Sequence, residues 1–91
     1  MNHNAASVPK LLFSNVPFDC RDEYLRFWVE ARGYKVLSLR LIRDVVSGTS
    51  PSFAYVQLMN SARTDEAVRA LNGQAIGNRR VQVDRIAAAA R

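Results

Sequence analysis

The chain has 91 residues, 48% of them hydrophobic, and a formal net charge of +5. This length corresponds to one domain with one small core. A single cysteine, Cys20, excludes an internal disulfide, and we expect its thiol to be inert. No stretch has the length and apolarity of a membrane span or a signal peptide, so we expect an intracellular chain, cytoplasmic or, in a eukaryote, nuclear. The basic residues are mostly arginines, which favours an anionic partner.

The first predicted strand runs from Lys10 to Val16, after a polar segment, 1–9, that we expect to be a disordered arm. Leu11 and Phe13 share one face of this strand, and Leu12 lies on the other.

A helix is predicted to begin at Asp19 or Cys20 and to end at Arg32-Gly33, where the glycine suits a helix C-terminus. Its apolar residues recur at helical spacing and predict a core-facing stripe. The stripe consists of Tyr24, Leu25, Trp28 and Val29.

A second strand is predicted over residues 34–44, followed by a loop at 45–51. Alternation along this strand predicts two faces. The first carries Leu37, Leu39 and Leu41, and the second carries Ser38, Arg40 and Ile42.

The stretch from Ser52 to Met59 alternates as a third strand. Ala54, Val56 and Leu58 form one face, and Phe53, Tyr55 and Gln57 form the other. The two rings stand about 7 Å apart at this spacing, which is close to the separation of two splayed nucleic-acid bases. Two interpretations are open at this point: both rings belong to the core, or they form a platform on which bases stack.

The remaining chain predicts a helix capped by Asn60-Ser61 and ended by Asn72-Gly73, a tight turn at Gly77-Asn78, and a last strand from Arg79 to Ile86. The apolar positions of the helix are Ala62, Ala67, Val68 and Leu71. In the strand Val81 and Val83 point inward, and Arg80, Gln82 and Asp84 point outward.

The element order is therefore β-α-β-β-α-β, the split βαβ arrangement of an α+β, ferredoxin-like fold. Right-handed crossovers place the first and third strands at the centre of a four-stranded antiparallel sheet, with both helices on one face. The face of Phe53 and Tyr55 then stays uncovered. Large aromatic side chains on an uncovered sheet face require a reason, and this favours stacking over a core role.

These residues resemble an RNA recognition motif across residues 10–86. LLFSNV on the first strand resembles the short ribonucleoprotein motif of that family, and PSFAYVQL, residues 51–58, resembles its octamer. LRLIRD, AVRALNG and RRVQV resemble its second strand, second helix and last strand. The chain departs from the family pattern where Leu12 replaces a third ring and where Pro51 and Ser52 replace a basic residue and a glycine.

The resemblance implies binding of single-stranded RNA on the open sheet face, with modest affinity and weak sequence preference, over about two to four nucleotides. Phe53 and Tyr55 would stack on bases, arginines would contact phosphates, and glutamines would pair with base edges. The candidate RNA-binding residues are Phe53, Tyr55, Leu12, Arg40, Arg80, Gln82, Gln57, Arg85 and Lys10. We expect no metal and no cofactor, a monomer, and single-stranded DNA as an alternative ligand.

Two other classes of function compete with RNA binding. A protein-interaction module with the same fold suits the apolar Leu12 and Ile42. An enzyme is not expected, because His3 and Cys20 assemble no nucleophile with a base and no metal cluster. The predicted domain occupies residues 10–86, with a short tail at 87–91, and the opening methionine favours a free-standing small protein over an excised piece.

Overall fold

The computed structural model describes residues 8–42 and 52–87. Outside this range lie residues 1–7 of the predicted arm (1–9), residues 43–44 of the second strand, the loop at 45–51 and residues 88–91 of the predicted tail (87–91). The described elements, in chain order, are β1 (Pro9–Val16), α1 (Asp22–Glu30), β2 (Val36–Ile42), β3 (Ser52–Leu58), the 3-10 helix η2 (Ser61–Arg63), α2 (Thr64–Leu71), β4 (Ala75–Ile76), β5 (Arg79–Arg80) and β6 (Gln82–Ala87).

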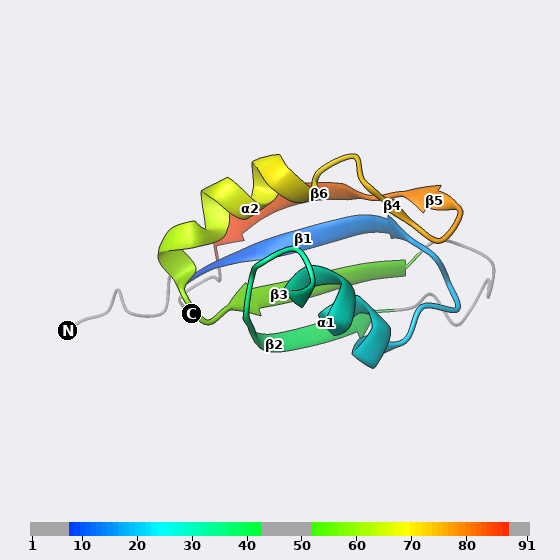
Figure 1. The fold of residues 1–91 in the computed structure, drawn as a ribbon, viewed down its shortest axis with the longest axis horizontal. Helices are drawn as coiled ribbons and strands as arrows, with labels where there is room; N and C mark the ends of the chain where they lie inside the picture. Colours follow the sequence, from blue (N-terminus) through cyan, green and yellow to red (C-terminus); the bar gives the residue numbers. More distant parts are fainter. Residues whose placement is uncertain (1–7, 43–51, 88–91) are drawn as a thin grey trace.

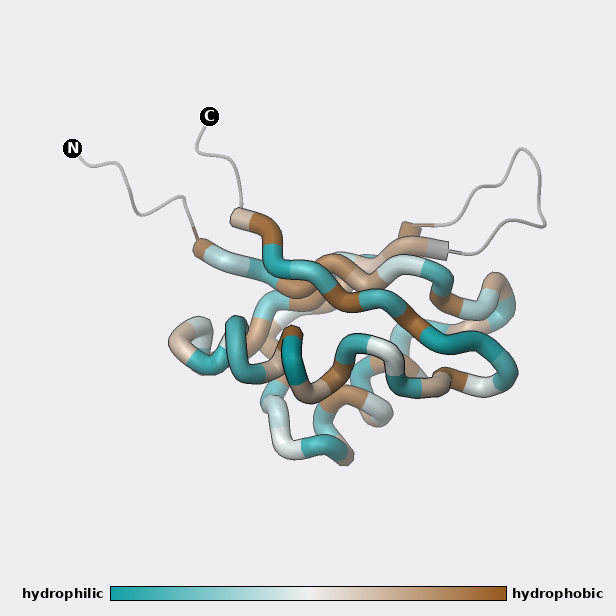
Figure 2. The backbone as a smooth tube through the Cα atoms, turned by 90° about the horizontal axis from the view of Figure 1, so that it is seen from above, coloured by the Kyte–Doolittle hydropathy of each residue, from teal (hydrophilic) through white to brown (hydrophobic). Residues whose placement is uncertain are grey.

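Four strands form an antiparallel sheet in the order β2-β3-β1-β6, so β1 and β3 are central. Both helices lie in front of the sheet in Figure 1. Figure 2 shows the same two layers edge on, with the sheet above and the helices below. The predicted α+β, ferredoxin-like arrangement is confirmed.

The core lies between the sheet and the two helices. The ring of Phe13 on β1 meets the edge of Trp28 on α1, with a centroid separation of 6.2 Å. The indole N–H of Trp28 donates a hydrogen bond of 3.1 Å to the carbonyl of Ala75, and the guanidinium of Arg32 covers its outer side at 3.8 Å from the ring centroid. Trp28 therefore connects α1, β1 and β4, and its predicted core role is confirmed.

Helix α1 begins at Asp22, later than the predicted Asp19 or Cys20. The intervening residues form a turn, because the N–H of Cys20 bonds to the carbonyl of Pro17. Tyr24 is 49% exposed, so its predicted place in the core stripe is wrong. Only the narrow face with Leu25, Trp28 and Val29 meets the sheet, and Tyr24 is rotated about 100° from Leu25.

The helix also ends earlier than predicted, at Glu30, with Ala31 as the C-cap residue. Gly33 lies in the turn that follows and has a φ of +98°, in the left-handed region that glycine adopts without a steric penalty. Gly33 therefore reverses the chain after the helix, two residues beyond the C-cap residue Ala31.

Strand β2 contains a bulge that was not predicted. Val36 pairs with Leu58 and Ser38 pairs with Gln57, so the register against β3 shifts between Val36 and Ser38. A bulge reverses the inward and outward alternation on one side of it. Leu37 is accordingly 54% exposed and, contrary to the predicted alternation, does not share a face with Leu39 and Leu41; those two side chains pack against the core.

The predicted last strand is divided into β5 and β6. β5 pairs with β4 in a small hairpin around the predicted turn at Gly77-Asn78. Val81 separates the two strands, because its N–H donates to the carbonyl of Gln74 and its carbonyl accepts from Gly73. Val81 and Val83 are both buried, as predicted.

The second helical segment starts with η2, whose cap is Asn60: its side-chain oxygen accepts from the N–H of Ala62. α2 itself begins only at Thr64, which is buried. Ala67 and Leu71 are buried as predicted. Ala62 is exposed, contrary to prediction, since η2 precedes the part of the helix that meets the sheet.

A polar cluster fixes the start of α2 to the turn before β2. Arg63 pairs with Glu66 at 2.7 Å, donates to the carbonyl of Gly33 and lies 4.5 Å from the ring centroid of Tyr34. The Tyr34 hydroxyl donates to Glu66 at 3.0 Å. Hydrogen bonds from Arg63 and then Tyr34 lower the pKa of Glu66, and burial raises the pKa of Tyr34.

We predict that Leu25→Ala lowers the free energy of unfolding by about 2 to 5 kcal/mol, because it leaves a cavity under α1. Leu37→Ala, the same change at the bulge, should cost less than about 1 kcal/mol, since the side chain is exposed. Urea denaturation of both variants measures the difference. Equal losses would contradict the bulge.

The free energy of unfolding should also depend on pH, through two glutamates. A hydrogen bond from the N–H of Val36 lowers the pKa of Glu30, just as Arg63 lowers that of Glu66. Their stabilising contribution is present above the ordinary glutamate pKa and is lost as the pH falls through the lowered folded values. The urea midpoint of Glu30→Gln, Glu66→Gln should therefore fall less between pH 7 and pH 3 than that of the wild type. A midpoint that falls as steeply in the double variant as in the wild type would contradict the assignment of this acid dependence to Glu30 and Glu66.

Candidate nucleic-acid interface

One row of side chains crosses the open face of the whole sheet. The strand pairing places Arg40 on β2 opposite Tyr55 on β3, Tyr55 opposite Leu12 on β1, and Leu12 opposite Asp84 on β6. Neighbouring strands lie about 4.8 Å apart, so successive members of the row are near neighbours. The row runs from a cation through a ring and an aliphatic side chain to a carboxylate.

A second row lies beside the first. Ile42 on β2 is opposite Phe53 on β3, and Ser14 on β1 is opposite Gln82 on β6. Phe53 is 49% exposed and Ile42 40% exposed, whereas Tyr55 is half-buried. The core interpretation of Phe53 is therefore excluded: this ring stands on the surface, beside Tyr55, on the sheet face opposite the described helices.

The third row contains Ser38 opposite Gln57 and Lys10 opposite Ile86. A hollow of about 330 Å³ opens at this side of the face. It is lined by Lys10, Ser38, Leu39, Arg40, Ile42 and Tyr55. The structure thus brings both cations, Lys10 and Arg40, to the same hollow as the Tyr55 ring.

Two predicted arginines are not part of this face. Arg85 pairs with the inward-facing Leu11, and its guanidinium forms an ion pair of 3.1 Å with Asp65 on α2. Arg80 lies in β5, outside the four-stranded sheet, and donates to the carbonyl of Gly73 at 3.0 Å. Alternation already carried the signal for Arg85, because a residue two positions after the inward Val83 must point the same way.

Asp84 is a residue of this face to which the sequence analysis gave no role. Alternation in the last strand predicted its outward orientation, and the strand pairing places it opposite Leu12. The side-chain amide of Gln82 donates to Asp84 Oδ2 at 3.3 Å. The neighbouring Ile86 lies on the same face. β6 therefore contributes an amide, a carboxylate and an aliphatic side chain.

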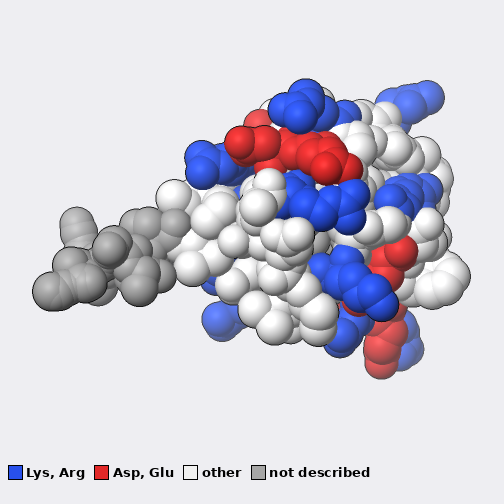
Figure 3. Space-filling view, turned by 60° about the vertical axis from the view of Figure 1, so that its left-hand side comes forward, with Lys and Arg blue, Asp and Glu red and all other residues white. Residues whose placement is uncertain are grey.

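The helical side of the molecule has a different character. Figure 3 shows that the acidic side chains visible there lie directly against basic ones. Three ion pairs join described side chains: Arg26 with Glu30, Arg63 with Glu66, and Arg85 with Asp65. Within each of these pairs the two charges largely offset one another.

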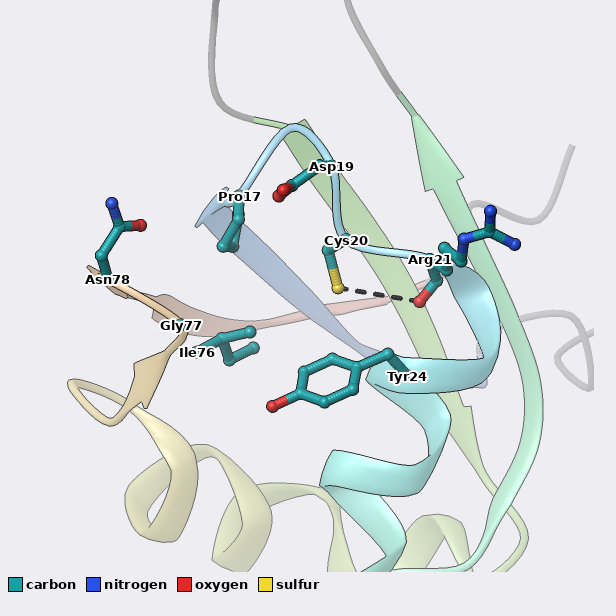
Figure 4. A pocket seen from close by; sticks show the side chains of 8 residues that line it. All are labelled: Pro17, Asp19, Cys20, Arg21, Tyr24, Ile76, Gly77 and Asn78. Atoms are coloured by element: carbon teal, nitrogen blue, oxygen red, sulfur yellow. Dashed lines mark hydrogen bonds between the residues drawn. The ribbon is translucent and has the colours of Figure 1, made fainter.

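A hollow of about 450 Å³ opens between the start of α1 and the β4–β5 hairpin. Figure 4 shows Tyr24 extending across it towards Ile76, while Asp19 and Asn78 stand at its rim. Phe27, further along α1, is 68% exposed. This side therefore presents aromatic surface of its own, away from the open sheet face.

Within residues 8–42 and 52–87 no group of three or more His, Cys, Asp or Glu side chains is placed to hold a metal ion. No helix of the described chain is long and apolar enough to cross a membrane. His3 lies outside the described residues.

Fold and face together define a small α+β domain with an open sheet that displays aromatic and basic side chains. The sequence profile of the RNA recognition motif family matches residues 11–82. The chain belongs to the RNA recognition motif family.

Curated relatives share this domain. A serine/arginine-rich SC35-like splicing factor of Arabidopsis thaliana is 36% identical over 78 residues, which cover 86% of this chain and 29% of the relative. A 28 kDa chloroplast ribonucleoprotein of Nicotiana sylvestris is 32% identical over 75 residues, which cover 82% of this chain and 27% of the relative. The chain therefore spans less than a third of the length of these relatives.

Solved structures show the same fold. The Mip6 RRM3 domain superposes with a TM-score of 0.75 at 22% identity, covering 86% of this chain and 92% of that one. The Rna15 RRM, solved with bound RNA (GU), superposes with a TM-score of 0.67 at 24% identity, covering 82% and 79% of the two chains.

Proposed function

We propose that the chain binds single-stranded RNA on the open sheet face, with one base stacked on Phe53 and another on Tyr55. The observation that carries this proposal is the exposure of Phe53 beside Tyr55 on an uncovered face. Family membership supports RNA as the ligand in general, and the Rna15 RRM is a member of the same fold that was solved with RNA.

The phosphate contacts are assigned to Lys10 and Arg40, because both line the hollow beside Tyr55. Gln57, opposite Ser38, and Gln82 supply amides for base edges. Two stacked bases contribute about 2 to 6 kcal/mol, and micromolar binding requires about 8 kcal/mol. Stacking alone therefore falls short, and the cations and amides must supply the remainder.

The first test is an amide NMR titration with a short single-stranded RNA of random sequence. Shifts should concentrate on β1, β2, β3 and β6 and should disappear in Phe53→Ala, Tyr55→Ala, because that variant removes both stacking surfaces. A matched control is Tyr24→Ala, Phe27→Ala, which removes one tyrosine and one phenylalanine from α1 and should leave the shifts unchanged.

The same titration separates RNA binding from the alternative, a protein-interaction module. A well-dispersed spectrum with no response to RNA would contradict the proposal and favour that alternative. Shifts that survive loss of both β3 rings would contradict stacking while retaining RNA as ligand.

The second test uses salt. For single-stranded ligands each phosphate contact contributes about −0.7 to the slope of log affinity against log salt. Lys10→Met and Arg40→Met should each make the slope shallower by about this amount. Arg85→Met is the control and should keep the wild-type slope, since Arg85 faces α2 and its exposed ion pair contributes little stability. An equal change in all three variants would contradict the assignment of phosphates to the Lys10 and Arg40 side.

The remaining parts of the proposal follow from this binding mode. A monomeric, non-enzymatic domain suffices for it, and single-stranded DNA offers the same bases to the same rings. The compartment stays a prediction, cytoplasmic or nuclear; one relative is named a splicing factor and another a chloroplast ribonucleoprotein.

A further inference from the structure

We infer that Asp84 makes the open face selective for guanine at the position above Leu12. This inference rests on the proposed binding of single-stranded RNA and names the base that the site prefers. It predicts more sequence preference than the family resemblance implies.

The position of Asp84 follows from the register of the sheet. Leu12 pairs with Tyr55 on one side and with Asp84 on the other. Tyr55 and Asp84 are therefore two strand spacings apart, about 10 Å. A base lying over Leu12 occupies the space between them, with one edge directed towards β6.

The charges of the row orient such a base. Arg40 stands beyond Tyr55 at the β2 end, and Asp84 stands at the β6 end. Phosphates are attracted to the cationic end and repelled from the carboxylate. The sugar-phosphate chain is thereby directed towards β2, and the Watson–Crick edge of the base towards Asp84.

Gln82 positions the carboxylate. Its amide donates to Asp84 Oδ2 at 3.3 Å. A carboxylate has two oxygens with about four acceptor sites, so one such bond leaves room for two donors from a ligand. No basic side chain of the described residues forms an ion pair with Asp84.

Base chemistry then distinguishes the four nucleotides. The guanine edge presents two adjacent donors, N1–H and the N2 amino group, which match the two oxygens of a carboxylate. Adenine and cytosine each present one amino group next to a ring nitrogen that is an acceptor, and uracil presents one N–H between two carbonyls. Those acceptors face the carboxylate and repel it. Charge-assisted pairs of this kind are the stronger hydrogen bonds, so the difference favours guanine.

The test measures affinities by fluorescence anisotropy for oligouridine strands that carry one central guanosine, one inosine or no substitution. Inosine lacks only the N2 amino group. Wild-type protein should bind the guanosine strand about fivefold to tenfold more tightly than the inosine strand. In Asp84→Asn this ratio should fall below about twofold, while affinity for plain oligouridine rises because a negative charge has been removed.

Glu23→Gln is the matched control: it removes one negative charge from α1, on the helical side, and should keep the wild-type ratio. Equal wild-type affinity for all three strands, lost on Phe53→Ala, Tyr55→Ala, would overturn the guanine inference and leave RNA binding intact. A guanosine preference that survives Asp84→Asn would also overturn it. Absence of binding to every strand would contradict the proposed function itself.

Discussion

The antiparallel pairing of β1 with β3 is the constraint on which the rest of the structure depends. It places Leu11 opposite Val56 and Phe13 opposite Ala54 on the covered face, and Leu12 opposite Tyr55 on the open one. Because side chains alternate with a period of two, a slip of one residue would expose the core and bury the rings. The core and the candidate interface are therefore specified by the same register. Burial of Leu11 and Phe13 stabilises this register, and the same register keeps Tyr55 and Phe53 on the open face.

The two faces of the molecule use charge in different ways. On the helical side basic residues are matched with acidic ones, as in the pairs Arg63 with Glu66 and Arg85 with Asp65. On the open face Arg40 and Asp84 stand at opposite ends of one row, separated by Tyr55 and Leu12. Separated charges produce an electrostatic field that can orient a charged ligand, whereas the fields of paired charges largely cancel. For this reason the proposed binding site is on the open face and not on the aromatic surface around Tyr24.

Much of this fold could be predicted from the sequence, and the errors share physical causes. The bulge at Leu37 arises in the pairing of β2 with β3, and the last strand is divided at Val81 by hydrogen bonds to Gly73 and Gln74 before the hairpin. Local alternation contains no information about such pairings. Tyr24 was misplaced because helical spacing gives the direction of a stripe but not the width of the surface that it meets.

The sequence by itself determined the order of elements, the family, and the pair Phe53 and Tyr55 on one strand face, because alternation and the motif residues are local properties of the chain. Only the tertiary structure decided which charged side chains become neighbours. It turned Arg85 towards Asp65, held Arg80 against Gly73, and brought Lys10, Arg40 and Asp84 around the rings. The reason is that these residues lie on different strands, and their neighbours follow from pairing between segments that are distant in the sequence.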